Sequence, residues 1–176
     1  MIHLAEATID EKDMDALSDW VKTYPRLTKG KLTLEFESKW AKWLGTKHTT
    51  FVNSGSSANL LMLATLMEAG DLEPGDAVIV PALSWATDLS PVMQLGLIPL
   101  LCDCNLEDFS VDLDHFKQII TEGVVKEMNG IRKRLRPKAA ILVSVLGLLP
   151  KMDVITKICS RNNVILLEDC CESLGS

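Results

Sequence analysis

The stretch Asn53–Asn59, NSGSSAN, has the residue types of a phosphate-binding turn. It lies between a short apolar run and an apolar helical pattern, so its glycine and three serines connect a strand to a helix. The free amides of a first helical turn and the positive end of the helix dipole favour an anion. The serines could equally do no more than cap the helix, and both interpretations stay open. The stretch is neither a Walker motif nor a G-x-G-x-x-G dinucleotide fingerprint.

Two further sets of candidates follow other apolar runs. Trp85 comes just after VIVPALS, where an indole could pack in the core or at its rim, or offer a flat face to an aromatic ligand. Glu168, Asp169 and Glu172 lie at the end of the apolar run VILLEDC. A carboxylate there is costly to bury without a partner, so a cationic group should face at least one of them. A metal ion is the alternative, although no histidine lies nearby in the sequence.

One ligand would satisfy all three sets. It would place a phosphate at Ser54–Ser57, a flat ring over Trp85 and a protonated ring nitrogen against Asp169. Pyridoxal phosphate (PLP) has these three parts, and a carboxylate on its pyridinium nitrogen keeps the ring an electron sink. The residue types therefore predict a PLP site.

These candidates must be brought together by the elements between them. Short apolar runs alternate with helical patterns, which is the signature of an α/β fold with a mostly parallel sheet. The expected strands are TTFVN, AVIVPAL, IPLLCDC, AAILVSVL and VILLEDC. The expected helices cover 11–22, 34–44, 57–68, 85–95, 112–121 and 152–161, with Asp10 as the cap of the first and Gly45 as the end of the second. Such sheets bind ligands outside the carboxyl ends of their strands, where all three sets of candidates lie.

Composition and charge exclude several classes of function. The chain has 176 residues, 47% of them hydrophobic, which is enough for a sizeable core. Its net charge of −6 is spread along the chain, so we expect no nucleic-acid partner. The basic stretch IRKRLRPK, 131–138, is interpreted as a solvated helix end and loop before a strand, with a binding patch for an anionic ligand or surface as the alternative.

The same patterns bear on the compartment. No apolar run reaches the roughly 18 residues that a membrane helix needs, and the N-terminus is too acidic for a signal peptide. We therefore expect a cytoplasmic protein without membrane contact. The five cysteines lack paired spacing, so we expect reduced thiols, four of them packed as small apolar groups at strand ends.

The sequence resembles the DegT-type family of fold-type I PLP enzymes, the nucleotide-sugar aminotransferases and dehydratases. The resemblance runs from about Ile9 to Ser176 and is carried by five segments in family order: LTKGKLTLEFESKWAKWLGTKHTTFVNSGSSANLL, GDAVIVPALSWAT, NLEDFSVDLDHF, VLGLLPKMDVI and VILLEDCCESLGS. It implies a three-layer α/β fold, a mostly parallel sheet with flanking helices, like the large domain of these enzymes. It also implies an N-terminal helical segment over 1–45, an incomplete PLP-binding domain over 46–176, and a C-terminal small domain that is absent.

The resemblance also implies roles for single residues. Gly55, Ser56 and Ser57 match the family's cradle for the cofactor phosphate. Trp85 matches the aromatic residue that stacks on the pyridine ring, and Asp169 matches the partner of the ring nitrogen. Glu172 falls where aminotransferase members usually have glutamine, near the ring oxygen of the cofactor. The segment LTKG, 27–30, falls where the family often approaches the sugar nucleotide.

Two departures from ordinary aminotransferases follow from the same comparison. The segments SGSSANLL, PALSWAT and EDCCESLG are closer to the dehydratase branch, which removes a sugar C3 hydroxyl and uses a histidine base in place of the Schiff-base lysine. The aminotransferase branch stays the alternative. In the family this lysine or histidine follows the Asp169 motif by some tens of residues, so we expect the catalytic residue to lie beyond Ser176 and this chain alone to be inactive.

The resemblance therefore implies the cofactor-binding part of an enzyme that acts on a nucleotide-linked keto-deoxysugar in polysaccharide or deoxysugar biosynthesis. A non-catalytic short paralogue that binds a phosphate ligand or a full-length partner is the alternative. An unrelated doubly wound nucleotide-binding module would need a phosphate loop that the sequence lacks. In the family's fold, the strands beside TTFVN come later in the chain, so an open edge here predicts a homo-oligomer, a local rearrangement or marginal stability.

Overall fold

The computed structural model describes residues 7–175. They form two compact units, one ending at Phe51 and one beginning at Val52. The expected division after residue 45 stays a prediction. Among the described residues, every helix is too short or too polar to cross a membrane.

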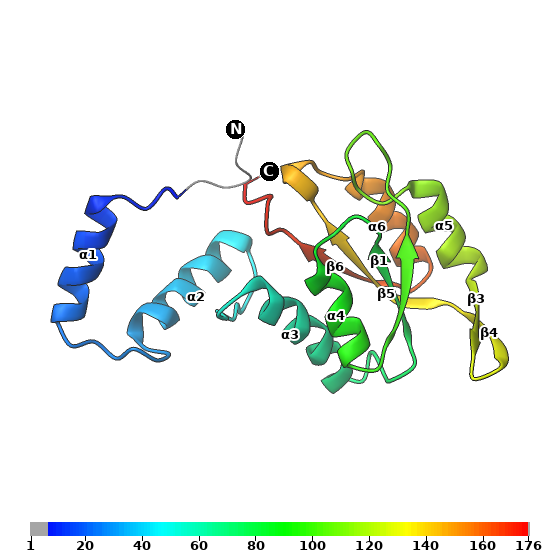
Figure 1. Cartoon of the computed structure of the whole chain (residues 1–176), viewed down its shortest axis with the longest axis horizontal. Helices are drawn as coiled ribbons and strands as arrows, with labels where there is room; N and C mark the ends of the chain where they lie inside the picture. The colour runs from blue at the N-terminus through cyan, green and yellow to red at the C-terminus, as the bar shows by residue number, and fades with distance from the viewer. Residues whose placement is uncertain (1–6, 176) are drawn as a thin grey trace. The chain divides into compact units, whose positions relative to one another are not determined.

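The first unit consists of helices α1 (Glu11–Lys22) and α2 (Lys31–Leu44) (Figure 1). Asp10 caps α1 as predicted: its carboxylate accepts from the amides of Lys12 and Asp13, and the Asp13 carboxylate accepts from the Asp10 amide. Gly45 ends α2 in the left-handed conformation, with φ of 75°, also as predicted. The second helix begins three residues earlier than its apolar pattern indicates.

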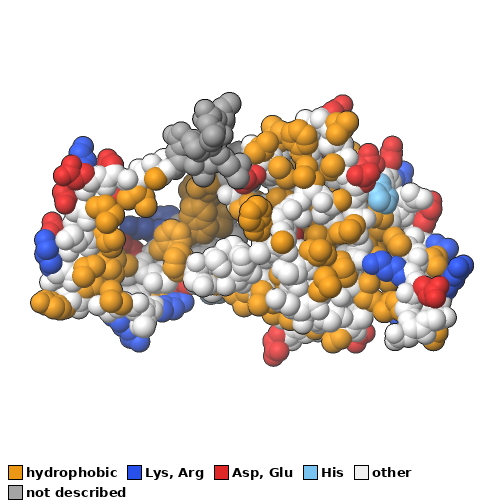
Figure 2. All heavy atoms as spheres, viewed as in Figure 1, with side chains coloured by type: hydrophobic (Ala, Val, Ile, Leu, Met, Phe, Trp, Pro, Cys, Tyr) orange, Lys and Arg blue, Asp and Glu red, His pale blue; other side chains and the backbone are white. Residues whose placement is uncertain are grey.

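The first unit exposes much of its apolar surface. No residue of α1 is buried, and Met14, Leu17 and Val21 are about half exposed along one face of the helix. Figure 2 shows such hydrophobic side chains at the surface. The sequence pattern predicts α1 correctly as an amphipathic helix. Its apolar face, however, is not covered by any other part of residues 7–51.

The expected strand TTFVN is wrong, because residues 49–53 form no strand. The segment binds α2 through one side chain and one backbone amide. The Thr49 hydroxyl donates to the Glu37 carbonyl at 2.7 Å, and the Phe51 amide donates to the Glu37 carboxylate at 2.9 Å. A strand needs a partner for its backbone ladder, and this segment has none among the four strands of the main sheet.

The second unit alternates helices and strands along the chain. Its elements are α3 (Gly55–Glu68), β1 (Ala77–Pro81), α4 (Ala86–Gln94), β2 (Ile98–Cys102), α5 (Leu113–Glu122), β3 (Val124–Met128), β4 (Ile131–Leu135), β5 (Pro137–Val143), the 3-10 turn η1 (Val145–Gly147), α6 (Met152–Arg161) and β6 (Ile165–Asp169). The main sheet has the order β2-β1-β5-β6 with all pairs parallel (Figure 1). This confirms the predicted α/β class and four of the five expected strands.

The two faces of the sheet carry two separate cores. Along β1, Ala77 and Ile79 pack with α5 and α6, whereas Val78 and Val80 pack with α3 and α4. Alternation with a period of two sends successive side chains to opposite faces, and all four are buried because helices cover both faces. The result is the predicted three-layer arrangement of helices, sheet and helices.

The interpretation of 131–138 as a helix end and loop is wrong. Strand β4 pairs antiparallel with β3 in a separate two-stranded ribbon. The turn is Asn129–Gly130, with φ of 53° and 77°, which is the conformation that an Asn-Gly hairpin turn favours. The Asn-Gly pair is the sequence signal for this hairpin, although the residues that follow it are mostly basic.

All five cysteines are free thiols, as expected. Burial raises the pKa of Cys102 to about 12 and that of Cys159 to about 11, so both stay protonated in the core. Cys170 and Cys171, however, are exposed after β6. For these two the expected packing as apolar groups is wrong, because the strand ends at Asp169 and the chain turns outward there.

Candidate functional site

A cavity of about 460 Å³ lies where β1, β5 and β6 end and α3 begins. The chain passes from β1 to β2 on one side and later returns to place β5 on the other side of β1. Ligands bind at such a reversal of strand order, outside the carboxyl ends of the strands. Gly55, Ser56, Trp85, Asp169 and Glu172 all line this cavity, so it brings together five of the six predicted site residues.

The start of α3 forms one wall. Ser54 is the N-cap, and its hydroxyl accepts from the Ser57 amide at 3.2 Å. Ser57 is the predicted residue that does not line the cavity, because its hydroxyl donates to the Asn53 side chain at 2.7 Å. A Cβ built on Gly55 would meet no other atom within 4 Å. Ser54 therefore caps α3, and the open first turn of this helix still faces the cavity.

Trp85 stands at the rim of the same cavity. It is the N-cap residue of α4 and is 72% exposed, so it is not part of either core. Trp85 therefore does not pack in the core, and its indole at the rim is open to a ring-shaped ligand. Covering an exposed indole with a ligand would remove apolar area from water and is therefore favourable.

Asp169 ends β6 and lines the same cavity. Its Oδ2 accepts from the Asn59 side chain at 2.8 Å, and its Oδ1 accepts from the Cys171 amide at 2.9 Å. Burial alone would raise the pKa of this carboxyl, but the hydrogen bonds from Asn59 and Cys171 outweigh it and hold the pKa below its usual range. The carboxylate is therefore ionised. Within residues 7–175 it makes no ion pair, so it can offer its charge to a cation in the cavity.

Two residues beside Asp169 were missed by the sequence analysis. Asn59 lies on α3 and Asp88 on α4, and both are almost fully buried. The Asn59 side chain donates to Asp88 Oδ1 at 2.9 Å as well as to Asp169. Burial, with the nearby charge of Asp169, raises the pKa of Asp88 to about 6. The only signal in the sequence was a polar residue inside each of two helical patterns.

Glu172 binds the protein itself. Its Oε2 accepts from the Leu146 amide at 2.6 Å, which ties the turn after β6 to the turn after β5. Leu146 has φ of 56°, a left-handed conformation that is unusual for leucine. One carboxylate oxygen is thus committed to holding a strained turn, while the residue also lines the cavity.

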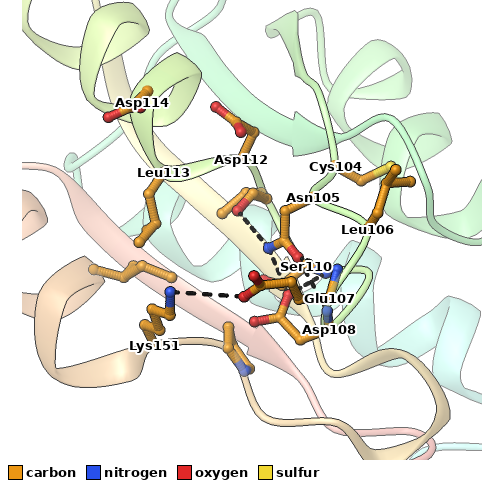
Figure 3. A pocket seen from close by; sticks show the side chains of 13 residues that line it. Cys104, Asn105, Leu106, Glu107, Asp108, Ser110, Asp112, Leu113, Asp114 and Lys151 are labelled. Carbon is orange, nitrogen blue, oxygen red and sulfur yellow. Dashed lines mark hydrogen bonds and ion pairs between the residues drawn. The ribbon is translucent and has the colours of Figure 1, made fainter.

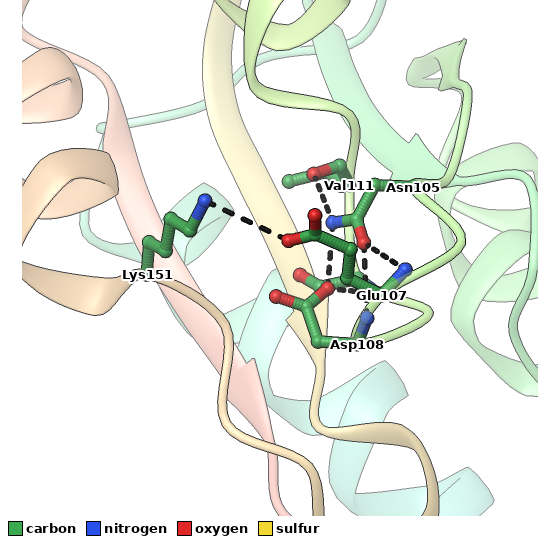
Figure 4. A network of polar contacts seen from close by, with 6 residues as sticks. Asn105, Glu107, Asp108, Val111 and Lys151 are labelled. Carbon is green, nitrogen blue, oxygen red and sulfur yellow. Dashed lines mark hydrogen bonds and ion pairs between the residues drawn. The ribbon is translucent and has the colours of Figure 1, made fainter.

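A second cavity, of about 570 Å³, lies beside the loop between β2 and α5 (Figure 3). Asn105 and Asp108 of this loop bind the loop's own backbone, and Glu107 forms an ion pair with Lys151 at 4.0 Å (Figure 4). Asn105 accepts from the amides of Glu107 and Asp108, and Asp108 accepts from the Ser110 amide. These side chains hold the shape of a loop, and the Ser110 hydroxyl is sealed from solvent. Among the described residues, no cluster of carboxylate, thiol and imidazole groups here or elsewhere is fit to hold a metal ion.

Comparison with protein families gives a match over residues 7–176 to the DegT/DnrJ/EryC1/StrS aminotransferase family. The chain belongs to this family. Membership confirms the predicted resemblance and excludes an unrelated nucleotide-binding module. The roles of the single site residues stay predictions.

Several DegT/DnrJ/EryC1/StrS relatives are similar to nearly the whole chain. A GDP-4-keto-6-deoxy-D-mannose 3-dehydratase of Yersinia pseudotuberculosis is 36% identical over 98% of this chain and 41% of that protein. A GDP-perosamine synthase of Caulobacter vibrioides is 28% identical over 99% of this chain and 43% of that protein. A solved structure of the Escherichia coli GDP-4-keto-6-deoxy-D-mannose-3-dehydratase with bound hydrated PLP has a TM-score of 0.80 and 34% identity, over 98% of this chain and 41% of that chain. The chain thus spans about two fifths of the length of these relatives.

Proposed function

We propose that this chain is the cofactor-binding part of a PLP-dependent enzyme that acts on a nucleotide-linked keto-deoxysugar. The observation that carries the proposal is the single cavity that joins the open first turn of α3, the exposed face of Trp85 and the ionised carboxylate of Asp169. These three features fit a phosphate, a flat ring and a protonated ring nitrogen. The similarity to PLP-binding enzymes of the family supports the same reading.

Each residue would contribute a defined interaction. Gly55 and Ser56 would bind the phosphate at the first turn of α3. The lack of a side chain at Gly55 leaves open the space that the phosphate would occupy. Trp85 would cover one face of the ring and exclude water from it. Asp169 would keep a proton on the ring nitrogen, and the bound cofactor would then supply an electron sink for bond cleavage at the sugar. Glu172 would position the turn after β5, through Leu146, beside the ring.

We further propose sugar 3-dehydration as the reaction of the whole protein. Three 3-dehydratases are 33 to 36% identical to this chain, whereas two GDP-perosamine synthases are 26 and 28% identical. Glutamate at position 172, where aminotransferase members usually have glutamine, points in the same direction. An aminotransferase is the alternative. Similarity to enzymes over nearly the whole chain favours both over a non-catalytic protein.

A binding measurement tests the cofactor assignment. Pyridoxamine 5′-phosphate is the suitable probe, because it binds without a covalent bond to a lysine. Isothermal titration of the chain should show saturable binding at one site. Asp169→Asn should weaken binding about tenfold, as expected for a hydrogen bond to a charged group, and the exposed Asp71→Asn should not. Absence of saturable binding would overturn the assignment.

We also propose that the chain associates with a second copy of itself. The support is the half-exposed apolar face of α1, formed by Met14, Leu17 and Val21. Light scattering after gel filtration should give a mass above that of one chain, and Leu17→Glu should lower it. A monomer at all concentrations, with a single cooperative melting transition, would contradict this proposal.

A further inference from the structure

Asn59 is a buried amide in a helix that is otherwise rich in apolar residues. It lies on the second turn of α3, is 3% exposed, and is surrounded in sequence by alanine and leucines. Burying an amide is costly unless its hydrogen bonds are satisfied. The side chain meets this condition by donating to Asp169 at 2.8 Å and to Asp88 at 2.9 Å, with a longer contact to the Thr87 carbonyl at 3.3 Å.

The geometry around Asp169 is fixed from two sides. Its two carboxylate oxygens accept from donors on different elements: Asn59 of α3, and the Cys171 amide after β6. Two such bonds define the plane of the carboxylate and leave further lone pairs for a ligand in the cavity. The amide of Asn59 is itself oriented without ambiguity, because both of its neighbours there are acceptors.

We propose that Asn59 is a positioning residue that holds the Asp169 carboxylate ionised and aimed at the ring nitrogen of the cofactor. The inference rests on the proposed function. Asn59 does not line the cavity and acts only through Asp169. Its two N–H groups join two carboxyl groups that would otherwise repel each other, and Asp88 serves as the anchor that keeps the amide in place.

Other side chains could not replace Asn59 in this role. Leucine has a similar volume but no donor, so Asp169 would lose one of its two hydrogen bonds in a buried setting. Aspartate would add a third carboxyl group to the cluster. The other titratable groups around Asp169 among the described residues are Asp88 from α4 and Cys171 and Glu172 from the turn after β6, and none of them carries a positive charge.

The test measures the titration of Asp169 in the ligand-free chain by carbon-detected NMR of its carboxyl group. In the wild type the carboxyl should titrate below its usual range, and in Asn59→Leu its midpoint should move upward. Asn162→Leu is the matched control, because Asn162 donates to a backbone carbonyl at the end of α6. An unchanged midpoint in a folded Asn59→Leu variant would overturn the inference.

A measurement on the wild type covers the case in which Asn59→Leu does not fold. The side-chain N–H signals of Asn59 should shift with pH at the titration midpoints of Asp169 and Asp88. Signals that follow neither midpoint would also overturn the inference.

Affinity for pyridoxamine 5′-phosphate separates this inference from the proposed function. If the wild type does not bind the probe, the proposed function fails, and the role of Asn59 toward the cofactor fails with it. If the wild type binds, Asn59→Leu should weaken binding about tenfold while binding of inorganic phosphate stays unchanged. Equal affinity of the two proteins for the probe would leave the proposed function intact and contradict the role of Asn59.

Discussion

Replacing Asp88 with asparagine should make the protein more stable at neutral pH. Asp88 is 1% exposed, its Oδ2 has no hydrogen-bond partner among the described residues, and the charge of Asp169 lies beside it. Burial and this neighbouring charge raise the pKa of Asp88 from its ordinary value of 3.8 to about 6. An ionised carboxyl at this position therefore costs free energy in the folded state.

The sign and size of the effect follow from linkage. Between about pH 4 and pH 6 the folded protein binds more protons than the unfolded chain, so wild-type stability falls as the pH rises. The full loss is about 3 kcal/mol, since each pKa unit corresponds to about 1.4 kcal/mol. Asp88→Asn keeps the shape of the protonated acid and never ionises. The variant should thus be close to the wild type below pH 4 and up to about 3 kcal/mol more stable above pH 6.

The effect of Asp169 does not obscure this window. Its pKa is lowered, so its stabilising contribution is present above pH 3.8 and is lost as the pH falls further. The difference between the wild type and Asp88→Asn from pH 4 to pH 6 therefore reports on Asp88, because Glu35 and Glu37, whose pKa values are lowered, are present in both proteins.

Urea unfolding between pH 4 and pH 8 is the assay, followed by the NMR signals of β1 and β5. Fluorescence would report mainly on the first unit, because Trp20, Trp40 and Trp43 precede Phe51. The control Asp71→Asn removes an exposed carboxylate and should change stability by less than about 0.5 kcal/mol at every pH. A difference between Asp88→Asn and the wild type that does not grow with pH would refute the reasoning.

Substitutions at three further positions test the walls of the cavity. Ser54→Ala removes the cap of α3 and should cost about 1 kcal/mol in urea unfolding; an unchanged midpoint would mean that the 3.2 Å bond to the Ser57 amide is not formed in solution. Gly55→Ala should stabilise α3 by roughly 0.5 to 1 kcal/mol. The same variant should bind pyridoxamine phosphate more weakly in a titration, because the new methyl group enters the open space that the phosphate would occupy. Unchanged affinity would place the phosphate elsewhere. Glu172→Ala frees the Leu146 amide and should destabilise by about 1 to 3 kcal/mol, whereas Glu172→Gln keeps an acceptor and should cost less; equal losses would contradict the bond.

Elements with a local signal were predictable from the sequence. Asp10 and Gly45 mark helix ends through interactions with their own neighbours, so the structure has both where the sequence places them. Strand β1 was equally clear, because an apolar run buried on both faces differs from every amphipathic pattern around it. The site followed from the same logic, since the carboxyl ends of parallel strands meet at one edge of the sheet.

Features that depend on distant partners were not predictable. The segment 49–53 has the composition of a strand, but its pairing is decided by what lies beside it, and Glu37 of α2 holds it instead. Asn59 and Asp88 are 29 residues apart and become meaningful only where α3 and α4 meet beside β6. A single polar residue in a helix gives no sign of such a partner.

The electrostatics of the cavity select a ligand with both signs of charge. The first turn of α3 attracts an anion, and the ionised Asp169 in the same lining attracts a cation. Inorganic phosphate would satisfy the first wall only, and a simple cation would leave the amides of α3 unbound. A molecule that carries a phosphate and a protonated ring nitrogen on one rigid frame satisfies both walls at once, so it should bind more tightly than either charge alone. Trp85 adds an exposed indole to the same lining, against which a flat frame can pack, and the three features together define the ligand more sharply than any one of them does.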